Sequence, residues 1–429
     1  MAMDRLRAAI AHISGSSQSA TFRSLYFNRI WIYGAVIVTL AGVVAEIVSM
    51  ALLGALVLAS AGIAKLWNQA TLSNVTLERT LSLDRALPGD IVTLKLTVTN
   101  RKPLPAPSLR IDEDLSEQIV PIGHRSTIDG TSGRRVLHLT GSLRPYERVT
   151  WTIPLECRAR GSHWVGPATL LSGDPFGFFS SREAEDRNVE LLVYPRVHPL
   201  ANLSLPNQQP LGEQSVARNL VTDPMRVSGI RDYRSEDPFR SIHWKATARQ
   251  SIIQVKVQEP VTTLSMMILL NLDTFDHFWE GLDMVSAEQS IEAAASIAAW
   301  GLNERFAVGL RANGVVARSD QSLRIPVGRG HTQLATLMSG FARLWAYSTI
   351  PFGQTMAAEI PRIPWGSTVV VVTPMMSKDI ESQLATLITR GRRTVLVPLG
   401  AAIDPGLPGL IVRPFGPTTF SREPAPEAA

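Results

Sequence analysis

The segment at residues 229–249, here called the signature segment, contains the side chains best suited to bind a partner. Its nineteen residues from Arg231 onward carry eight charges, whereas 18% of the whole chain is charged. Five charges are basic and three are acidic, so the segment could close on itself as an ion-pair network or offer arginine forks to a partner. The candidate partner-binding set is Arg231, Tyr233, Asp237, Arg240, Trp244, Lys245 and Arg249.

The sequence lacks the common motifs of enzymatic catalysis. It contains no G-x-x-x-x-G-K-[ST] phosphate loop, no H-E-x-x-H zinc motif and no G-x-S-x-G nucleophile elbow. The glycine-rich stretch at residues 327–331 reads as a turn before a helix, and the eight histidines are dispersed. We therefore predict that the protein is not an enzyme, has no catalytic residues and uses no cofactor.

Charge and cysteine content narrow the class of protein further. The 42 basic and 37 acidic residues leave a net charge of +5, which is a mild excess spread over 429 residues. A dedicated nucleic-acid binder concentrates its positive charge, so we predict no nucleic-acid partner. Cys157 is the single cysteine, which excludes an intramolecular disulfide, and its alternating surroundings predict a small thiol in a core.

Residues 30–66 are hydrophobic enough to lie in a membrane, with Glu46 and Lys65 as the only charges. One straight helix of this length would measure about 55 Å, well beyond the ~30 Å hydrocarbon core of a bilayer. Two short spans, at residues 30–45 and 48–66, fit better, with Glu46 at the turn between them. A buried hairpin in a soluble domain is the alternative.

The charges around this hairpin predict its orientation. Four arginines precede it in residues 1–29, whereas the turn near Glu46 contains no lysine or arginine. By the positive-inside rule, both ends of the hairpin then face the cytoplasm. We predict a basic cytoplasmic segment at residues 1–29 and soluble domains on the cytoplasmic side of the membrane.

Two further domains follow the hairpin. Residues 72–199 alternate apolar and polar side chains between Pro-rich and Gly-rich turns, which predicts an antiparallel β-sandwich. Residues 200–262 form a connector and the signature segment, where residues 239–250 could be a short helix or two strands. Residues 263–415 alternate apolar strands with helices, including a helix at about 332–346, which predicts a doubly wound α/β sheet. Residues 416–429 are predicted to be disordered.

The signature segment resembles the signature of the DUF58 family of bacterial membrane-anchored proteins. The residues that carry the resemblance are Tyr233, Asp237, Arg240, Ile242, Trp244, Lys245, Ala246, Ala248 and Arg249. The RG-to-GP strand pair at residues 160–167 and the DPFG turn at residues 174–177 also look like this family. The chain departs from the family at Glu236, where Gly is usual, and at His243, where Asp is usual.

The resemblance implies that residues 263–415 adopt a von Willebrand factor A-like fold. In that fold, a D-x-S-x-S loop after the first strand holds Mg²⁺ through oxygen ligands. Asp273 aligns with the Asp, but Phe275 and His277 replace the two Ser, and Phe275 supplies no oxygen. We predict no working metal site, although Asp273 and Asp276 could gather a weakly held cation. The simplest role for Asp273 is to cap the loop toward the next helix.

The family resemblance also implies a MoxR-type AAA+ ATPase as partner and a non-enzymatic adaptor or assembly role at the membrane. For the signature segment we weigh a domain-joining network against a docking face and favour the joining role. The alternative functions are a metal-dependent ligand-binding receptor and an envelope-processing enzyme. Oligomeric state and client stay open.

Overall fold

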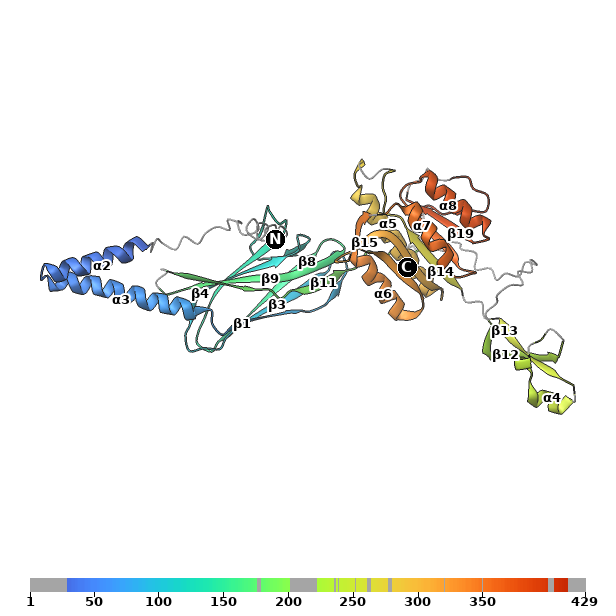
Figure 1. The fold of residues 1–429 in the computed structure, drawn as a ribbon, viewed down its shortest axis with the longest axis horizontal. Coiled ribbons are helices and arrows are strands. Elements are labelled where there is room, and N and C mark those ends of the chain that lie inside the picture. Colours follow the sequence, from blue (N-terminus) through green and yellow to red (C-terminus); the bar gives the residue numbers. More distant parts are fainter. Residues whose placement is uncertain are drawn as a thin grey trace, which may run out of the picture. The chain divides into compact units, whose positions relative to one another are not determined.

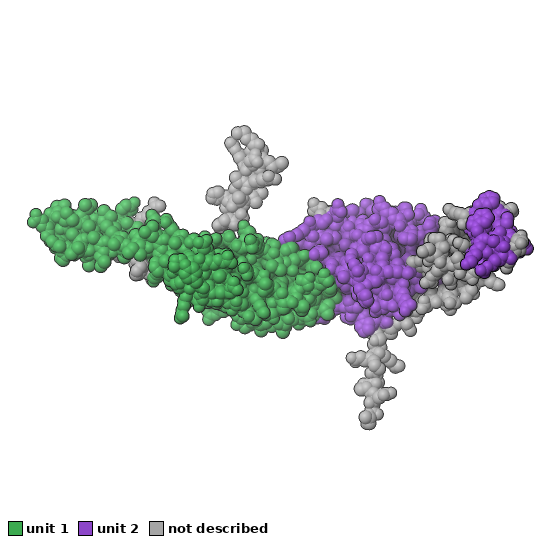
Figure 2. Space-filling model, turned by 90° about the horizontal axis from the view of Figure 1, so that it is seen from below, with its two compact units in different colours: residues 1–195 green, residues 196–429 purple. Residues whose placement is uncertain are grey.

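The computed structural model describes residues 29–175, 179–200, 222–234, 237, 239–250, 252–260, 264–276, 280–319, 321–348, 350–399 and 405–415. The chain divides into two compact units, Met1–Pro195 and Arg196–Ala429 (Figure 2). Together they form a mixed α/β fold with several sheets. Most of the predicted basic segment, most of the connector and the predicted disordered tail lie outside the described residues.

Unit 1 begins with two apolar helices, α2 (Arg29–Val44) and α3 (Val48–Thr71), that pack against each other (Figure 1). Glu46 lies in the tight turn between them with a positive φ of 56°. Within the described part of the chain, α3 is the one helix that is long and apolar enough to cross a membrane by length and composition. It ends at Thr71, later than the predicted end of the second span at residue 66.

The rest of unit 1 consists of two sheets. The first has the order β1-β3-β8-β5, formed by β1 (Val75–Leu81), β3 (Ile91–Asn100), β8 (Arg148–Cys157) and β5 (Ile119–Pro121). The second has the order β2-β11-β9-β4-β7-β6, with β10 paired to β9. Its strands are β2 (Arg85–Ala86), β11 (Val189–Val193), β9 (Gly161–Gly173), β4 (Ala106–Leu115), β7 (Arg135–Leu143), β6 (Ser126–Ile128) and β10 (Ser180–Glu185).

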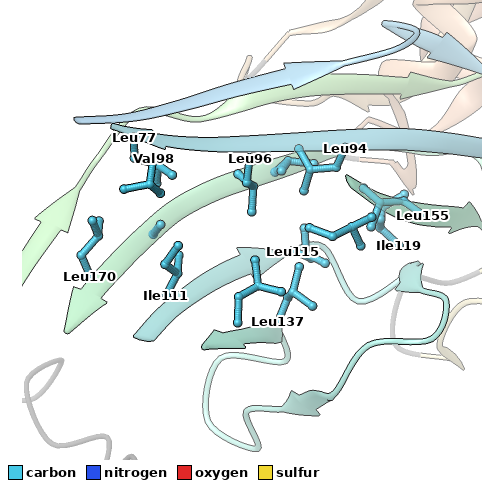
Figure 3. Packing of buried hydrophobic residues seen from close by; sticks show 14 of the residues in the cluster. Leu77, Leu94, Leu96, Val98, Ile111, Leu115, Ile119, Leu137, Leu155 and Leu170 are labelled. Atoms are coloured by element: carbon cyan, nitrogen blue, oxygen red, sulfur yellow. The ribbon is translucent and has the colours of Figure 1, made fainter. Parts of the chain in front are cut away.

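Both sheets contribute to one apolar core. Every second residue of β3 is buried, and Figure 3 shows Leu96 and Val98 pointing toward Ile111 of β4 in the other sheet. The alternation in the sequence has this physical cause, because successive side chains of a strand point to opposite faces. Cys157 belongs to this core, where burial raises the pKa of its thiol to about 11, so the predicted core thiol is confirmed.

Unit 2 contains a small two-stranded sheet around the signature segment. Strand β12 (Thr222–Asp232) pairs antiparallel with β13 (Gln254–Pro260). A single 3-10 turn (Phe239–Ser241) and helix α4 (Trp244–Gln250) connect the two strands. Residues 239–250 are therefore mostly helical, with Ile242 in an isolated bridge to Val255 between the two helical pieces, which favours the helical alternative that the sequence left open.

The larger sheet of unit 2 has the order β16-β15-β14-β18-β19-β20. All of its neighbouring strands run parallel except β16, which is antiparallel to β15. The strands are β14 (Ser265–Leu270), β15 (Ala307–Val316), β16 (Ser322–Gly328), β18 (Thr368–Thr373), β19 (Thr394–Pro398) and β20 (Ile411–Val412).

Helices cover this sheet on both sides (Figure 1). They are α5 (Met284–Asn303), α6 (Gly330–Arg343), α7 (Phe352–Glu359) and α8 (Lys378–Thr389). Met267 and Leu269 of β14 pack toward α7 and α8, whereas Met266 lies against Gly301 of α5. Every residue of β14, β18 and β19 is buried, as expected for central parallel strands covered on both faces.

One predicted helix was too long. The helix expected at residues 332–346 ends at Arg343, and Leu344–Ser348 form strand β17, which pairs antiparallel with the end of β15. Leu344 and Ala346 are buried while Trp345 and Tyr347 are exposed, which is the alternation of a strand. Pairing with β15 overrides the helical pattern of the preceding residues.

Candidate functional site

The two described acidic residues of the signature segment, Asp232 and Asp237, are bonded within the module formed by β12, β13, the 3-10 turn and α4. Arg231 donates to both oxygens of Asp237, at 2.7 Å from Nη1 and 2.6 Å from Nη2. Asp237 also accepts the backbone N–H of Arg234 at 2.9 Å. The hydrogen bond from Arg231 is the largest cause of the lowered pKa of Asp237. This bidentate pair closes the turn after β12.

A second set of contacts ties β13 to the end of β12 and to the residues just before α4. Asp232 accepts a hydrogen bond from Gln254 Nε2 at 2.5 Å, and the Gln254 carbonyl accepts the backbone N–H of His243 at 2.7 Å. Ile242 and Val255 form a backbone bridge and are 5% and 3% exposed. Ile242 therefore anchors the start of α4 in the small core of this module.

The outward surface of the module is aromatic and basic. Phe239 and Trp244 are 75% and 70% exposed, and Lys245 and Arg249 are exposed as well. Residues 245 and 249 lie one helical turn apart, so both cations share a face of α4, the helix that begins at Trp244. Neither cation forms an ion pair with any described residue.

The seven predicted binding residues thus separate into groups. Arg231 and Asp237 form the internal ion pair, and Tyr233 is half-buried and stacks on Phe239 with ring centroids 6.0 Å apart. Trp244, Lys245 and Arg249 are exposed on α4. Arg240 lies in the 3-10 turn, but its side chain, like residue Glu236, is outside the description.

A second polar cluster lies at the carboxyl end of the parallel strands in the larger sheet. The chain places β15 on one side of β14 and β18 on the other, which makes the end of β14 a topological switch point, where α/β sheets commonly bind ligands. Asn271 Nδ2 donates to Thr373 Oγ1 at 3.0 Å, and Leu272 N–H donates to Asn313 Oδ1 at 2.9 Å. Both asparagines are fully buried.

Asp273 is held by donors from another part of the chain. One carboxylate oxygen accepts the hydroxyl of Ser348, and the other accepts the backbone N–H of Phe352 at 2.9 Å. Phe352 is the first residue of α7, so Asp273 caps α7. The expectation that Asp273 caps the loop toward the next helix was wrong, because Asp283 caps that helix, α5, by accepting the Val285 N–H at 3.0 Å.

The residues around Asp273 determine whether a metal ion could bind there. Phe275 and Asp276 are exposed, and His277 lies outside the described residues. Among the residues that the structure describes, no group of three or more His, Cys, Asp or Glu side chains could hold a metal ion. Sequence reasoning missed Asn271, Asn313 and Ser348. The one available signal was that Asn271 interrupts an otherwise apolar strand end.

Residues 229–410 match the family model "Protein of unknown function DUF58". The match begins at the first residue of the signature segment and ends at residue 410, just before β20 of the larger sheet of unit 2, which confirms the family resemblance for this part of the chain. It covers fewer than half of the 429 residues.

A curated relative and several solved structures also resemble the chain. "Uncharacterized protein YeaD" of Bacillus subtilis (strain 168) is 21% identical over 201 residues, which are 46% of this chain and 48% of the relative. The chain thus matches about half the length of that protein. Spo0M, a sporulation control protein from Bacillus subtilis, is 10% identical with a TM-score of 0.17, covering 28% of this chain and 49% of that one.

A cohesin module from Clostridium perfringens ATCC13124 is 12% identical with a TM-score of 0.18, covering 28% of this chain and 95% of that one. AvmM, described as catalysing macrocyclization in alchivemycin A biosynthesis, is 15% identical with a TM-score of 0.22, covering 29% of this chain and 91% of that one. Similarity at these scores supports no functional argument.

Proposed function

We propose that this protein is a membrane-anchored, non-enzymatic adaptor or assembly factor whose signature segment docks a partner protein. The observation that carries the proposal is that the acidic and basic side chains of the signature segment differ in their surroundings. Asp232 and Asp237 are bonded internally, whereas Lys245 and Arg249 are exposed on the same helix as the exposed Trp244. Exposed tryptophan and arginine are the residue types enriched at the energetic centres of protein interfaces.

This arrangement supports the docking role of the segment over the joining role that the sequence alone favoured. A joining network needs the ion pairs of the segment to reach another part of the chain. The pair between Arg231 and Asp237 instead joins two residues only six positions apart in the sequence. The cations of α4 are left available for an acidic surface on a partner.

The partner that we propose is a MoxR-type AAA+ ATPase, as the DUF58 resemblance implies. We further propose that residues 72–199 form a β-sandwich, that residues 263–415 are von Willebrand factor A-like, and that the network around Asp273 replaces the metal of that fold. The buried asparagines and the occupied carboxylate oxygens of Asp273 support this last point.

The anchor that we propose is a two-span hairpin made of α2 and α3, with both ends in the cytoplasm. Close packing of the two helices supports a hairpin. A Cβ atom added at Gly42 would lie 2.5 Å from the backbone nitrogen of Ala51, and one added at Gly54 would collide with Thr39. Small residues at such contacts are typical of helices that associate inside membranes.

The test is crosslinking and pull-down from native membranes with wild type, Lys245→Glu/Arg249→Glu and a charge-reversal control, Lys95→Glu, at an exposed position of β3. We expect an AAA+ ATPase to be captured by wild type and the control, and capture to fall about tenfold in the double variant. An unchanged melting temperature with lost capture supports docking. Unfolding of the double variant, or equal capture by all three proteins, would contradict it.

A further inference from the structure

We infer that the end of unit 1 next to α3 rests on the lipid headgroup layer, with Arg101, Arg144 and Tyr146 as the side chains that contact headgroup phosphates and glycerol. The inference rests on the membrane anchoring proposed above and adds a lipid-contacting surface outside the spans. It concerns two loops, residues 101–105 between β3 and β4 and residues 144–147 between β7 and β8.

The end of α3 is fixed to these sheets by direct contacts. The buried Lys102 ammonium donates to the Thr71 carbonyl and, at 2.8 Å, to the Ser73 carbonyl. On another side of the helix, Ser181 Oγ donates to the Asn68 carbonyl at 2.8 Å. A cation at a helix C-terminus satisfies free carbonyls and the helix dipole. The helix therefore enters the two-sheet region without a free linker.

The length of α3 places this junction at the depth of the headgroups. Its 24 residues measure about 36 Å, whereas the hydrocarbon core is about 30 Å thick and takes roughly twenty residues. The last turn, which includes Asn68 and Thr71, then lies in the headgroup layer of about 5 to 7 Å. Lys102 bonds to the end of this turn, so its loop lies at the same depth.

The two loops form one surface. Asn100 Nδ2 donates to the Leu104 carbonyl at 3.0 Å and to the Arg144 carbonyl at 2.9 Å. The backbone N–H of Tyr146 donates to the Lys102 carbonyl at 3.3 Å. Tyr146 must therefore lie beside the residue that caps α3.

The side chains on this surface suit a lipid interface. Tyr146 is 69% exposed and has a positive φ of 54°, an unfavourable conformation for a residue with a side chain. Arg101 and Arg144 are exposed, and the neighbouring Glu147 carboxylate accepts the Arg144 backbone N–H at 2.6 Å. Tyrosine favours the headgroup region, and arginine binds phosphate oxygens.

The experiment uses the full chain in lipid vesicles with a fluorescent label on one introduced cysteine. The native Cys157 need not be replaced, because it is buried and burial raises the pKa of its thiol. For a label at Leu56→Cys, in the middle of α3, we measure the quenching of its fluorescence by a nitroxide on the acyl chains. For a label at Tyr146→Cys, we measure the quenching by a nitroxide on the headgroup. Thr131→Cys is the matched control, because it lies in the turn at the opposite end of β7.

We expect quenching at positions 56 and 146, and at least threefold weaker quenching at position 131. Quenching at 56 with equal, weak quenching at 146 and 131 would overturn the headgroup contact while the membrane anchor stands. No quenching at 56 would overturn the anchor and this inference with it.

The charge contribution is tested in the same Tyr146→Cys protein. In vesicles with anionic lipid, Arg144→Gln should reduce headgroup quenching at position 146 about twofold, whereas Lys95→Gln, the removal of an exposed cation from β3, should leave it unchanged. Equal quenching in all three proteins would overturn the role of Arg144.

Discussion

At the scale of single residues, the contact between Arg79 of β1 and Glu113 of β4 joins the two sheets of unit 1. Arg79 Nε lies 2.5 Å from Glu113 Oε1, and the two side chains are 3% and 0% exposed. Burial raises the pKa of Glu113 to about 7, although the hydrogen bond from Arg79 opposes the shift. Arg79 Nη2 and Glu113 Oε2 have no hydrogen-bond partner within the described parts of the chain.

The stability of unit 1 should therefore depend on pH through Glu113. Folded Glu113 keeps its proton up to about pH 7, while the unfolded carboxyl loses it near 4.5, so stability falls as pH rises through this window. We expect a loss of roughly 3 kcal/mol between pH 4.5 and 8. Glu113→Gln should remove this dependence, measured by urea unfolding with hydrogen exchange of β3 as the readout. The control Glu78→Gln, at an exposed position, should keep it.

Asp273 gives a second prediction at this scale. Asp273→Asn keeps one acceptor for Ser348 and Phe352 in place of two, so unit 2 should lose about 1 to 2 kcal/mol of unfolding free energy. Thermal unfolding of wild type should not change with millimolar Mg²⁺ or Mn²⁺, and calorimetry should show no binding heat. A rise in melting temperature with either metal that Asp273→Asn abolishes would instead favour the metal-dependent receptor.

At the scale of elements, the close approach of α2 and α3 depends on glycines of both helices. Gly54 has no space for a side chain because Thr39 lies against it, whereas Gly62 on the same helix has nothing within 4 Å of the position that an added Cβ atom would take. The two positions therefore separate helix packing from helix propensity and hydrophobicity.

Gly54→Leu should destabilise the helix pair by about 1 to 3 kcal/mol, because the added side chain forces the helices apart. Gly62→Leu is the matched control and should leave the pair unchanged or slightly more stable. The measurement is unfolding by SDS titration in mixed micelles, followed by helicity. Equal effects of the two substitutions would show that α2 and α3 do not pack through Gly54.

At the scale of the whole molecule, the two compact units have separate cores. Leu96 is fully buried in the core of unit 1, and Leu384 is fully buried among α7, α8 and the larger sheet of unit 2. Each core is built from side chains of its own unit, so cooperative unfolding should follow the units.

Calorimetry of the full chain should accordingly resolve two unfolding transitions. Leu96→Ala should lower the melting temperature of one transition and Leu384→Ala that of the other. Each substitution should cost about 2 to 5 kcal/mol of unfolding free energy, because it leaves a cavity in a packed core. A single transition that both variants shift equally would show that the units unfold together.

The sequence by itself determined the features that depend on local pattern. Alternation predicted the strands around residues 93–99, continuous apolar runs predicted β14, β18 and β19, and the length of residues 30–66 predicted an apolar pair of helices. These follow from the period of side chains along a strand or helix, so neighbouring residues are enough to predict them.

Only the tertiary structure decided which polar groups meet. Ser348 binds Asp273 across 75 positions of sequence, Arg79 binds Glu113 across 34, and Lys102 caps α3 across 31. The pairing of β17 with β15 likewise made the helix predicted at residues 332–346 end at Arg343. Sheet register and chain crossing set these contacts, and no local period encodes them, because strands far apart in sequence align only when the whole domain folds.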